Sequence, residues 1–127
     1  MNGVTYDTGA LIAADRNDRR MWALHAGFLA LEVSPTVPTP VLAEAWRGGP
    51  RRASLARFLA LCTTEPLTED QAKAVGTLAA RAGHDDIVDV TLVEGVIRRH
   101  DAVVTSNPTH IRKIADATRA RLTIETI

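Results

Sequence analysis

The sequence predicts an α/β fold, a three-layer α/β/α sandwich around a short parallel sheet. Short segments with the apolar pattern of strands alternate with longer segments whose apolar residues recur at helical spacing, which is typical of a parallel sheet covered on both faces. The chain has 127 residues, of which 46% are hydrophobic, so it suits one ordered domain over residues 1–127. Proline and glycine mark several boundaries between the segments.

The first half of the chain is expected to contain two strands and three helices. The early segment GVTYDT is short and bounded by Gly9, whereas MWALHAGFLALEV has the apolar spacing of a helix. The proline-rich PTVPTP allows only a brief strand. Pro40 suits the first position of a helix and Gly48 suits its end. In order, the expected elements are a strand at 3–8, a helix at 19–33, a strand at 36–39 and helices at 40–48 and 51–62.

The second half is expected to alternate strand and helix up to the C-terminus. Thr68 suits the N-cap of a helix with Glu69 and Asp70 in its first turn. Asn107 suits the cap of the last helix, and Pro108 its first position. The final segment RLTIETI alternates apolar and polar residues, as an edge strand does. The expected elements are a weak strand at 63–67, helices at 69–83 and 86–99, a strand at 101–106, a helix at 108–118 and a strand at 121–127.

Composition narrows the classes of function. Basic and acidic residues number 15 each, so a uniformly basic nucleic-acid-binding surface is not supported. Arginine clusters at residues 16–20, 47–52 and 98–99 suit phosphate contacts, but the arginine-rich codons of a GC-rich genome explain them equally well. Cys62 is the only cysteine, which excludes an intramolecular disulfide. No apolar run reaches the ~20 residues of a membrane span, and the first residues do not resemble a signal peptide, so we expect a cytoplasmic protein with no membrane partner.

Several polar residues are expected to meet at one edge of the sheet. Asp7 ends the first strand, Glu44 lies one turn into the helix after the second strand, and Asn107 follows the strand at 101–106. Asp86 and Asp89 open a helix that leads into that strand, so this helix begins at the same edge. In parallel sheets, sites form where the strands reach their carboxyl ends. Four separate segments therefore deliver these side chains to one place.

A metal site explains acidic residues at the border of the core. Asp86 and Asp89 are three residues apart and share one face of a helix. Carboxylates that lie close together raise each other's pKa, and a divalent cation relieves that repulsion. Oxygen ligands suit Mg²⁺ or Mn²⁺. Alternatives stay open: Asp7 equally suits the cap of a helix beginning near Thr8, and Asp85 suits a cap better than a ligand.

For the remaining polar and aromatic residues, the sequence indicates mainly structural roles. Asn107 can serve as a cap, as a site residue, or as both. The four histidines are scattered, with no pair at metal spacing on one helix, so we expect structural or surface roles for them. Core positions are expected for the larger aromatic residues Trp22, Phe28 and Trp46.

Three segments together resemble a known family. They are YDTGALIA near the N-terminus, PVLAEAWR about forty residues later, and DIVDVTLVEGVIRRHDAVVTSNPTHI near the C-terminus. Their order and spacing resemble the PIN-domain ribonucleases, specifically VapC-type toxins of toxin–antitoxin pairs, over essentially the whole chain. The family's three acids fall on Asp7, Glu44 and Asp89. Its fourth acidic position falls on Asn107, a departure that removes one negative charge and for which Asp86 can partly compensate.

The resemblance implies an activity and partners. It implies metal-dependent hydrolysis of phosphodiester bonds in structured RNA, such as loops of transfer or ribosomal RNA, with Asp7 and Asp89 as ligands of Mg²⁺ or Mn²⁺ and Asp86 as a further candidate ligand. Glu44 would position or deprotonate water, and Asn107 would hydrogen-bond a bound water or the substrate. A small antitoxin protein and a homodimer are implied as partners.

Two rival functions remain at this point. A PIN-like module could bind RNA or protein without cleavage, since Asn107 replaces an acid. A phosphoacceptor signalling domain shares the parallel sheet with acids at its edge. However, such a domain needs an acidic pair after the first strand, where Asp7 stands alone, and a lysine after the last strand, whereas Lys113 lies inside a predicted helix.

Overall fold

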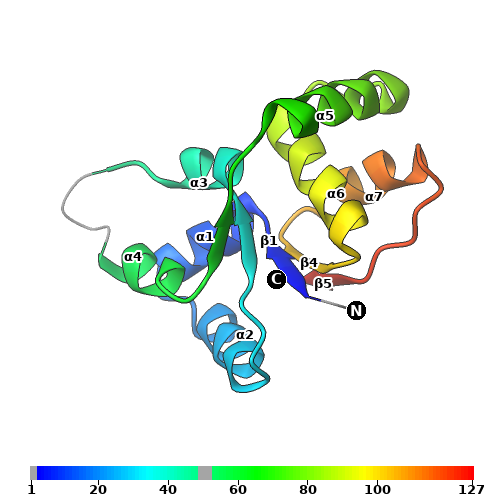
Figure 1. Cartoon of the computed structure of the whole chain (residues 1–127). Helices are drawn as coiled ribbons and strands as arrows, with labels where there is room; N and C mark the ends of the chain where they lie inside the picture. Colours follow the sequence, from blue (N-terminus) through cyan, green and yellow to red (C-terminus); the bar gives the residue numbers. More distant parts are fainter. Residues whose placement is uncertain (1–2, 49–52) are drawn as a thin grey trace.

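The computed structural model describes residues 3–48 and 53–127, in which one or two helices separate successive strands (Figure 1). The elements of the described chain are, in order, β1 Val4–Tyr6, α1 Thr8–Asp15, α2 Arg19–Ala30, β2 Thr36–Pro38, α3 Thr39–Ala45, α4 Ala53–Leu59, β3 Thr63–Glu65, α5 Glu69–Ala82, α6 Ile87–Arg99, β4 Ala102–Thr105, α7 Pro108–Asp116 and β5 Ile124–Thr126.

The strands form one parallel sheet with the order β3-β2-β1-β4-β5. Its register pairs Tyr6 with Val104 at the centre and Val37 with Thr64 toward one edge. Helices α1, α2 and α4 lie on one side of the sheet, and α5, α6 and α7 lie on the other (Figure 1). The predicted α/β sandwich with a short parallel sheet is therefore confirmed, including the position of the last strand at an edge.

Burial follows the position of each strand in the sheet. Every residue of the central strands β1 and β4 is buried, as expected for strands covered on both faces. The edge strands β3 and β5 are mostly exposed. Among the core side chains, Tyr6 and Phe58 are fully buried and their rings pack 5.3 Å apart. His25 stacks on Phe58 at 3.9 Å and hydrogen-bonds the Tyr6 hydroxyl at 2.9 Å, which confirms a structural role for this histidine.

The chain order of the strands locates the edge at which a site can form. From β1 the chain continues to β2 and β3 on one side, and it later enters β4 and β5 on the other. The connections that follow β1 and β4 therefore diverge at the carboxyl ends of two adjacent strands, which is where α/β sheets bind ligands. Asp7 lies at this point, because its backbone N–H donates to the Val104 carbonyl at 3.1 Å.

Some expectations differ from the structure in detail. The helix expected over residues 19–33 ends at Ala30, and the last strand is shorter than expected. The start expected for a helix at residue 51, together with Arg51 and Arg52, lies outside the described residues. The prediction that Trp46 lies in the core is wrong: this side chain is 42% exposed, because the chain leaves α3 in an extended conformation at this residue. None of the helices in the described ranges is long and apolar enough to cross a membrane.

Candidate functional site

Asp7 is held firmly between β1 and α1. Its carboxylate caps α1, accepting from the Ala10 N–H at 2.8 Å, and it also accepts from the Thr105 hydroxyl and from the Ser106 N–H at 3.3 Å. The side chain is only 8% exposed. A carboxylate has about four acceptor positions, so these three hydrogen bonds leave about one for another ligand. Asp7 is thus a helix cap, as one reading of the sequence expected, and it retains capacity for a second role.

The pKa values of Asp7 and Asp89 are both raised, and the charge of Asp89 acts on Asp7. Burial raises the pKa of Asp7, its hydrogen bonds with Thr105, Ala10 and Ser106 lower it, and the negative charge of Asp89 raises it further. The pKa of Asp89 is raised by burial and then by Asp86, against the lowering effect of nearby histidines. Both carboxyl groups therefore favour protonation more than free carboxyl groups do. This is the environment that a bound cation would stabilise.

Asp86 is the cap of α6. Its Oδ1 accepts from the Val88 N–H at 3.0 Å and from the Asp89 N–H at 3.2 Å. The prediction that the preceding residue, Asp85, serves as the cap is therefore wrong by one position, because α6 begins at Ile87. Asp86 fixes the first turn of the helix and, through it, the backbone of Asp89.

Glu44 lies close to the beginning of α1. Its Oε1 accepts a hydrogen bond of 2.6 Å from the Thr8 hydroxyl, and Thr8 follows Asp7 directly. The side chain is half-buried rather than fully solvated. The contact between α3 and α1 thus brings Glu44 to the same end of α1 as Asp7.

Asn107 occupies the expected position before α7, but its side chain does not cap that helix. Its backbone N–H donates to Thr105 Oγ1 at 2.8 Å, which links it to the hydroxyl that also donates to Asp7. The side-chain Nδ2 lies 3.1 Å from Nδ1 of His110. Asn107 is therefore part of the same polar network, through Thr105 on one side and His110 on the other.

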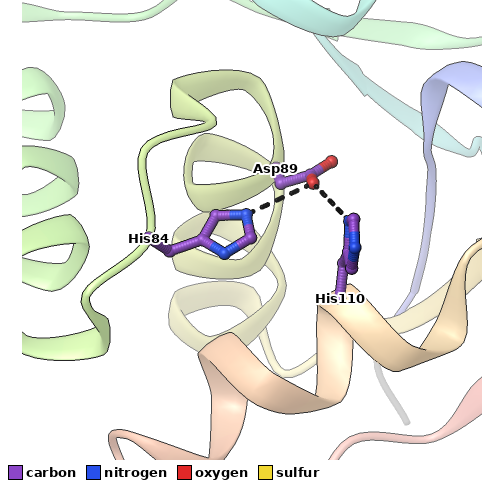
Figure 2. A group of neighbouring side chains, drawn as sticks. All are labelled: His84, Asp89 and His110. Atoms are coloured by element: carbon purple, nitrogen blue, oxygen red, sulfur yellow. Dashed lines mark ion pairs between the residues drawn. The ribbon is translucent and has the colours of Figure 1, made fainter.

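Two histidines flank Asp89, and their position was not expected from the sequence (Figure 2). His84 Nε2 lies 3.5 Å from Asp89 Oδ2, and His110 Nδ1 lies 3.6 Å from the same oxygen. The two histidines are not on one helix, as the sequence indicated, but their rings lie 5.7 Å apart. His84 precedes α6 and His110 lies in the first turn of α7, so both histidines lie where a helix begins at the carboxyl edge of the sheet, as the acids do. The expected start of these two helices at one edge was the signal in the sequence that could have located them.

The ligand atoms close enough to share one ion form a smaller set than the sequence predicted. In residues 3–48 and 53–127, the one group of three or more possible ligands with all atoms within 4.8 Å of one another is His84, Asp89 and His110. Asp7 and Glu44 are outside this group. The charge of Asp89 raises the pKa of Asp7, and Glu44 accepts a hydrogen bond from Thr8, the residue after Asp7.

Comparison with known proteins identifies the fold. No protein-family model and no curated protein matches the sequence. Among solved structures, the chain is similar to one from the crystal structure of VapBC2 from Rickettsia felis bound to a DNA fragment from their promoter, with a TM-score of 0.73 over 98% of both chains and 16% sequence identity. A likeness at this identity concerns the fold. It confirms the PIN-like α/β arrangement that the sequence predicted.

Proposed function

We propose that this protein is a divalent-metal-dependent endoribonuclease and the toxin of a type II toxin–antitoxin pair. The observation that carries the proposal is the position of Asp7 and Asp89, which come from separate elements and meet at the carboxyl edge of β1 and β4, where the charge of Asp89 raises the pKa of Asp7. Burial raises the pKa of both carboxyl groups, and the charge of Asp89 adds to the effect on Asp7; carboxyl groups with raised pKa values are common where protein groups perform chemistry.

The donor atoms at this edge fit Mg²⁺ or Mn²⁺. Asp7 keeps about one free acceptor position after its three hydrogen bonds. Both histidine contacts of Asp89 fall on Oδ2, and its other oxygen points away from the two rings (Figure 2). Asp86 is a further candidate ligand. A hard cation held by these oxygens would act as a Lewis acid toward the phosphate and lower the pKa of bound water.

Glu44 and Asn107 would act on water and on the substrate. The Thr8 hydroxyl donates to Oε1 of Glu44, which fixes the carboxylate and leaves Oε2 to accept a proton from a water molecule. Asn107 is exposed at the end of β4, where its amide can donate to a phosphate oxygen. Arg47 is also exposed and follows α3, so it would contact a flanking phosphate.

The substrate and the partners follow from the family resemblance. The substrate would be a single-stranded loop of a structured RNA, such as transfer or ribosomal RNA, because bases in loops are open to recognition. The likeness to a chain of the VapBC2 structure supports a small antitoxin as a partner of this chain. A homodimer of the chain is part of the same proposal.

A second candidate is a PIN-like module that binds RNA or protein without cutting it. Asn107 favours this candidate, because it is neutral where the resemblance implies an acid and its side chain lies against His110. The absence of Asp7 and Glu44 from the closest group of possible ligands favours it as well.

Cleavage of purified transfer and ribosomal RNA separates the two candidates. The wild-type protein should cut RNA with Mg²⁺ or Mn²⁺ and lose activity in chelator, and Asp7→Asn and Glu44→Gln should each reduce the rate by about 100-fold or more. Glu32→Gln is the matched control, because it changes an exposed acid before β2, at the opposite edge of the sheet. Equal cleavage in chelator would contradict the metal role, and RNA binding without cleavage would support the binding module.

A further inference from the structure

We propose that His84, Asp89 and His110 form a binding site for a first-row transition metal ion such as Zn²⁺. This site goes beyond the proposed nuclease function, and ion binding there does not require RNA cleavage. It differs from the proposed Mg²⁺ or Mn²⁺ site in its donors, since two of its three ligands are imidazole nitrogens. Imidazole suits Zn²⁺ and its neighbours in the first row, whereas Mg²⁺ prefers oxygen.

The distances between the donor atoms agree with a shared ion. His84 Nε2 and His110 Nδ1 lie 3.5 and 3.6 Å from Asp89 Oδ2, and all three atoms lie within 4.8 Å of one another. Bonds of about 2.0–2.1 Å in tetrahedral geometry place neighbouring ligand atoms about 3.4 Å apart. The distance from the Asp89 oxygen to each nitrogen is therefore about the distance between neighbouring ligands of a tetrahedral ion (Figure 2).

The backbone fixes His84 although it lies between two helices. Gly83 ends α5 in the left-handed conformation, with φ of 60°, which glycine adopts without strain. The His84 N–H donates to the Ala79 carbonyl at 3.1 Å and the Gly83 N–H donates to the Ala80 carbonyl at 3.3 Å. This pair of hydrogen bonds is a Schellman motif. His84 is therefore held by the end of α5, while Asp89 and His110 are held in the first turns of α6 and α7.

A buried nitrogen of His84 lacks a good hydrogen bond. Its Nε2 is buried, and it makes no hydrogen bond of acceptable geometry with the described residues, although Asp89 Oδ2 faces it at 3.5 Å. The His84 side chain is only 11% exposed, so water replaces that partner poorly. A buried polar atom without a partner costs free energy. A metal ion between Nε2 and Asp89 would satisfy both groups.

The other histidine can be released for an ion at low cost. His110 Nδ1 lies 3.1 Å from Nδ2 of Asn107, so ion binding would replace that hydrogen bond. Asn107 is exposed, and its amide can turn toward water. Two imidazoles and one carboxylate leave at least one coordination position open, which is the arrangement of ion sites that also bind water or a substrate.

Titration of the metal-free full chain with Co²⁺ tests the site, because Co²⁺ absorbs visible light when nitrogen ligands bind it and Zn²⁺ displaces it. The wild-type protein should bind one Co²⁺, lose the absorption on addition of Zn²⁺ and retain it in excess Mg²⁺. Loss of a supporting group around a metal weakens binding by about 10–100-fold, so loss of a ligand in His84→Ala or His110→Ala should weaken it by at least about that factor. His110 is 53% exposed, so its substitution should preserve the fold.

The matched control removes a histidine elsewhere. His100 follows α6 with a positive φ of 58°, a conformation that asparagine tolerates, so His100→Asn should bind Co²⁺ as the wild type does. Asp7→Asn should also keep Co²⁺ binding while losing RNA cleavage, which separates this site from the nuclease proposal. The inference is overturned if the wild type binds no Co²⁺, or if His84→Ala and His110→Ala, both folded by circular dichroism, bind it unchanged.

Discussion

Replacing Asp7 by asparagine should flatten the pH dependence of the protein's stability. Burial raises the pKa of Asp7, and the charge of Asp89 adds to this effect. When folding raises the pKa of a carboxyl group, the group contributes its full stabilisation at pH values below its pKa in the unfolded chain. This contribution is lost as the pH rises through its pKa in the folded protein. In Asp7→Asn this titration is absent, so the loss between about pH 4 and neutral pH should shrink.

The magnitudes show why the pH dependence, rather than the stability at one pH, is the quantity to compare. Each unit by which the folded pKa exceeds the unfolded one costs about 1.4 kcal/mol at neutral pH. Asparagine can keep the cap hydrogen bond from Ala10, since it caps helices as well as aspartate does. The Ser106 N–H and the Thr105 hydroxyl, however, both donate to the oxygen that the amide nitrogen replaces, and each lost hydrogen bond should lower the free energy of unfolding by about 1 kcal/mol. At neutral pH the removal of the raised pKa stabilises the variant, whereas the loss of hydrogen bonding destabilises it, so the two effects oppose each other.

The assay is urea denaturation of both proteins in chelator at several pH values, from about pH 4, the ordinary pKa of an aspartate side chain, to about pH 8. Asp89 keeps part of the slope, because its own pKa is raised. A saturating divalent cation at about 100 times its Kd should then add about 2.7 kcal/mol to the wild type at neutral pH and much less to the variant. An identical pH slope in the two proteins would refute the reasoning.

Three further predictions concern the surroundings of this site. A Cβ at Gly9 would overlap Oγ of Ser106, so Gly9→Ala should lower the free energy of unfolding, measured in urea, by about 1–3 kcal/mol. Adding Ser106→Gly in the same chain should restore much of the lost stability. An unchanged urea midpoint in Gly9→Ala would contradict this packing. Thr105→Val should raise the pKa of Asp7 further in a carbon-detected NMR titration, because the lost hydrogen bond favours the charged carboxylate; a lower pKa would oppose this. Burial raises the pKa of Cys62 to about 12, so its thiol should react with a disulfide reagent far more slowly in the folded protein than in urea, and equal rates would show that it is accessible.

Local chemistry made much of the fold predictable from the sequence. Thr68 caps α5 through a 3.2 Å hydrogen bond from the Gln71 N–H, as a threonine before two acids predicts. Pro40 and Pro108 lie in the first turns of α3 and α7, where a missing N–H costs nothing. Each of these signals lies within a few residues of the boundary it marks. The alternation of elements then predicted the parallel sheet.

The rest depended on contacts between distant segments. Asp85 and Asp86 are equally suitable caps by composition, and Asp86 serves as the cap because α6 begins at Ile87. His84 and His110 are 26 residues apart and meet only because α6 and α7 pack side by side with their first turns at the same edge. Trp46 has the composition of a core residue, but the extended backbone after α3 exposes it.

Anomalous diffraction from crystals grown with Mn²⁺ tests the site most directly. The nuclease account requires Asp7 and Asp89 to ligate one cation, so it predicts a peak within bonding distance of both carboxylates, and loss of that peak in Asp7→Asn. The absence of any peak within bonding distance of Asp7 at the carboxyl ends of β1 and β4 would contradict it, whether or not a second peak lies at His84 and His110.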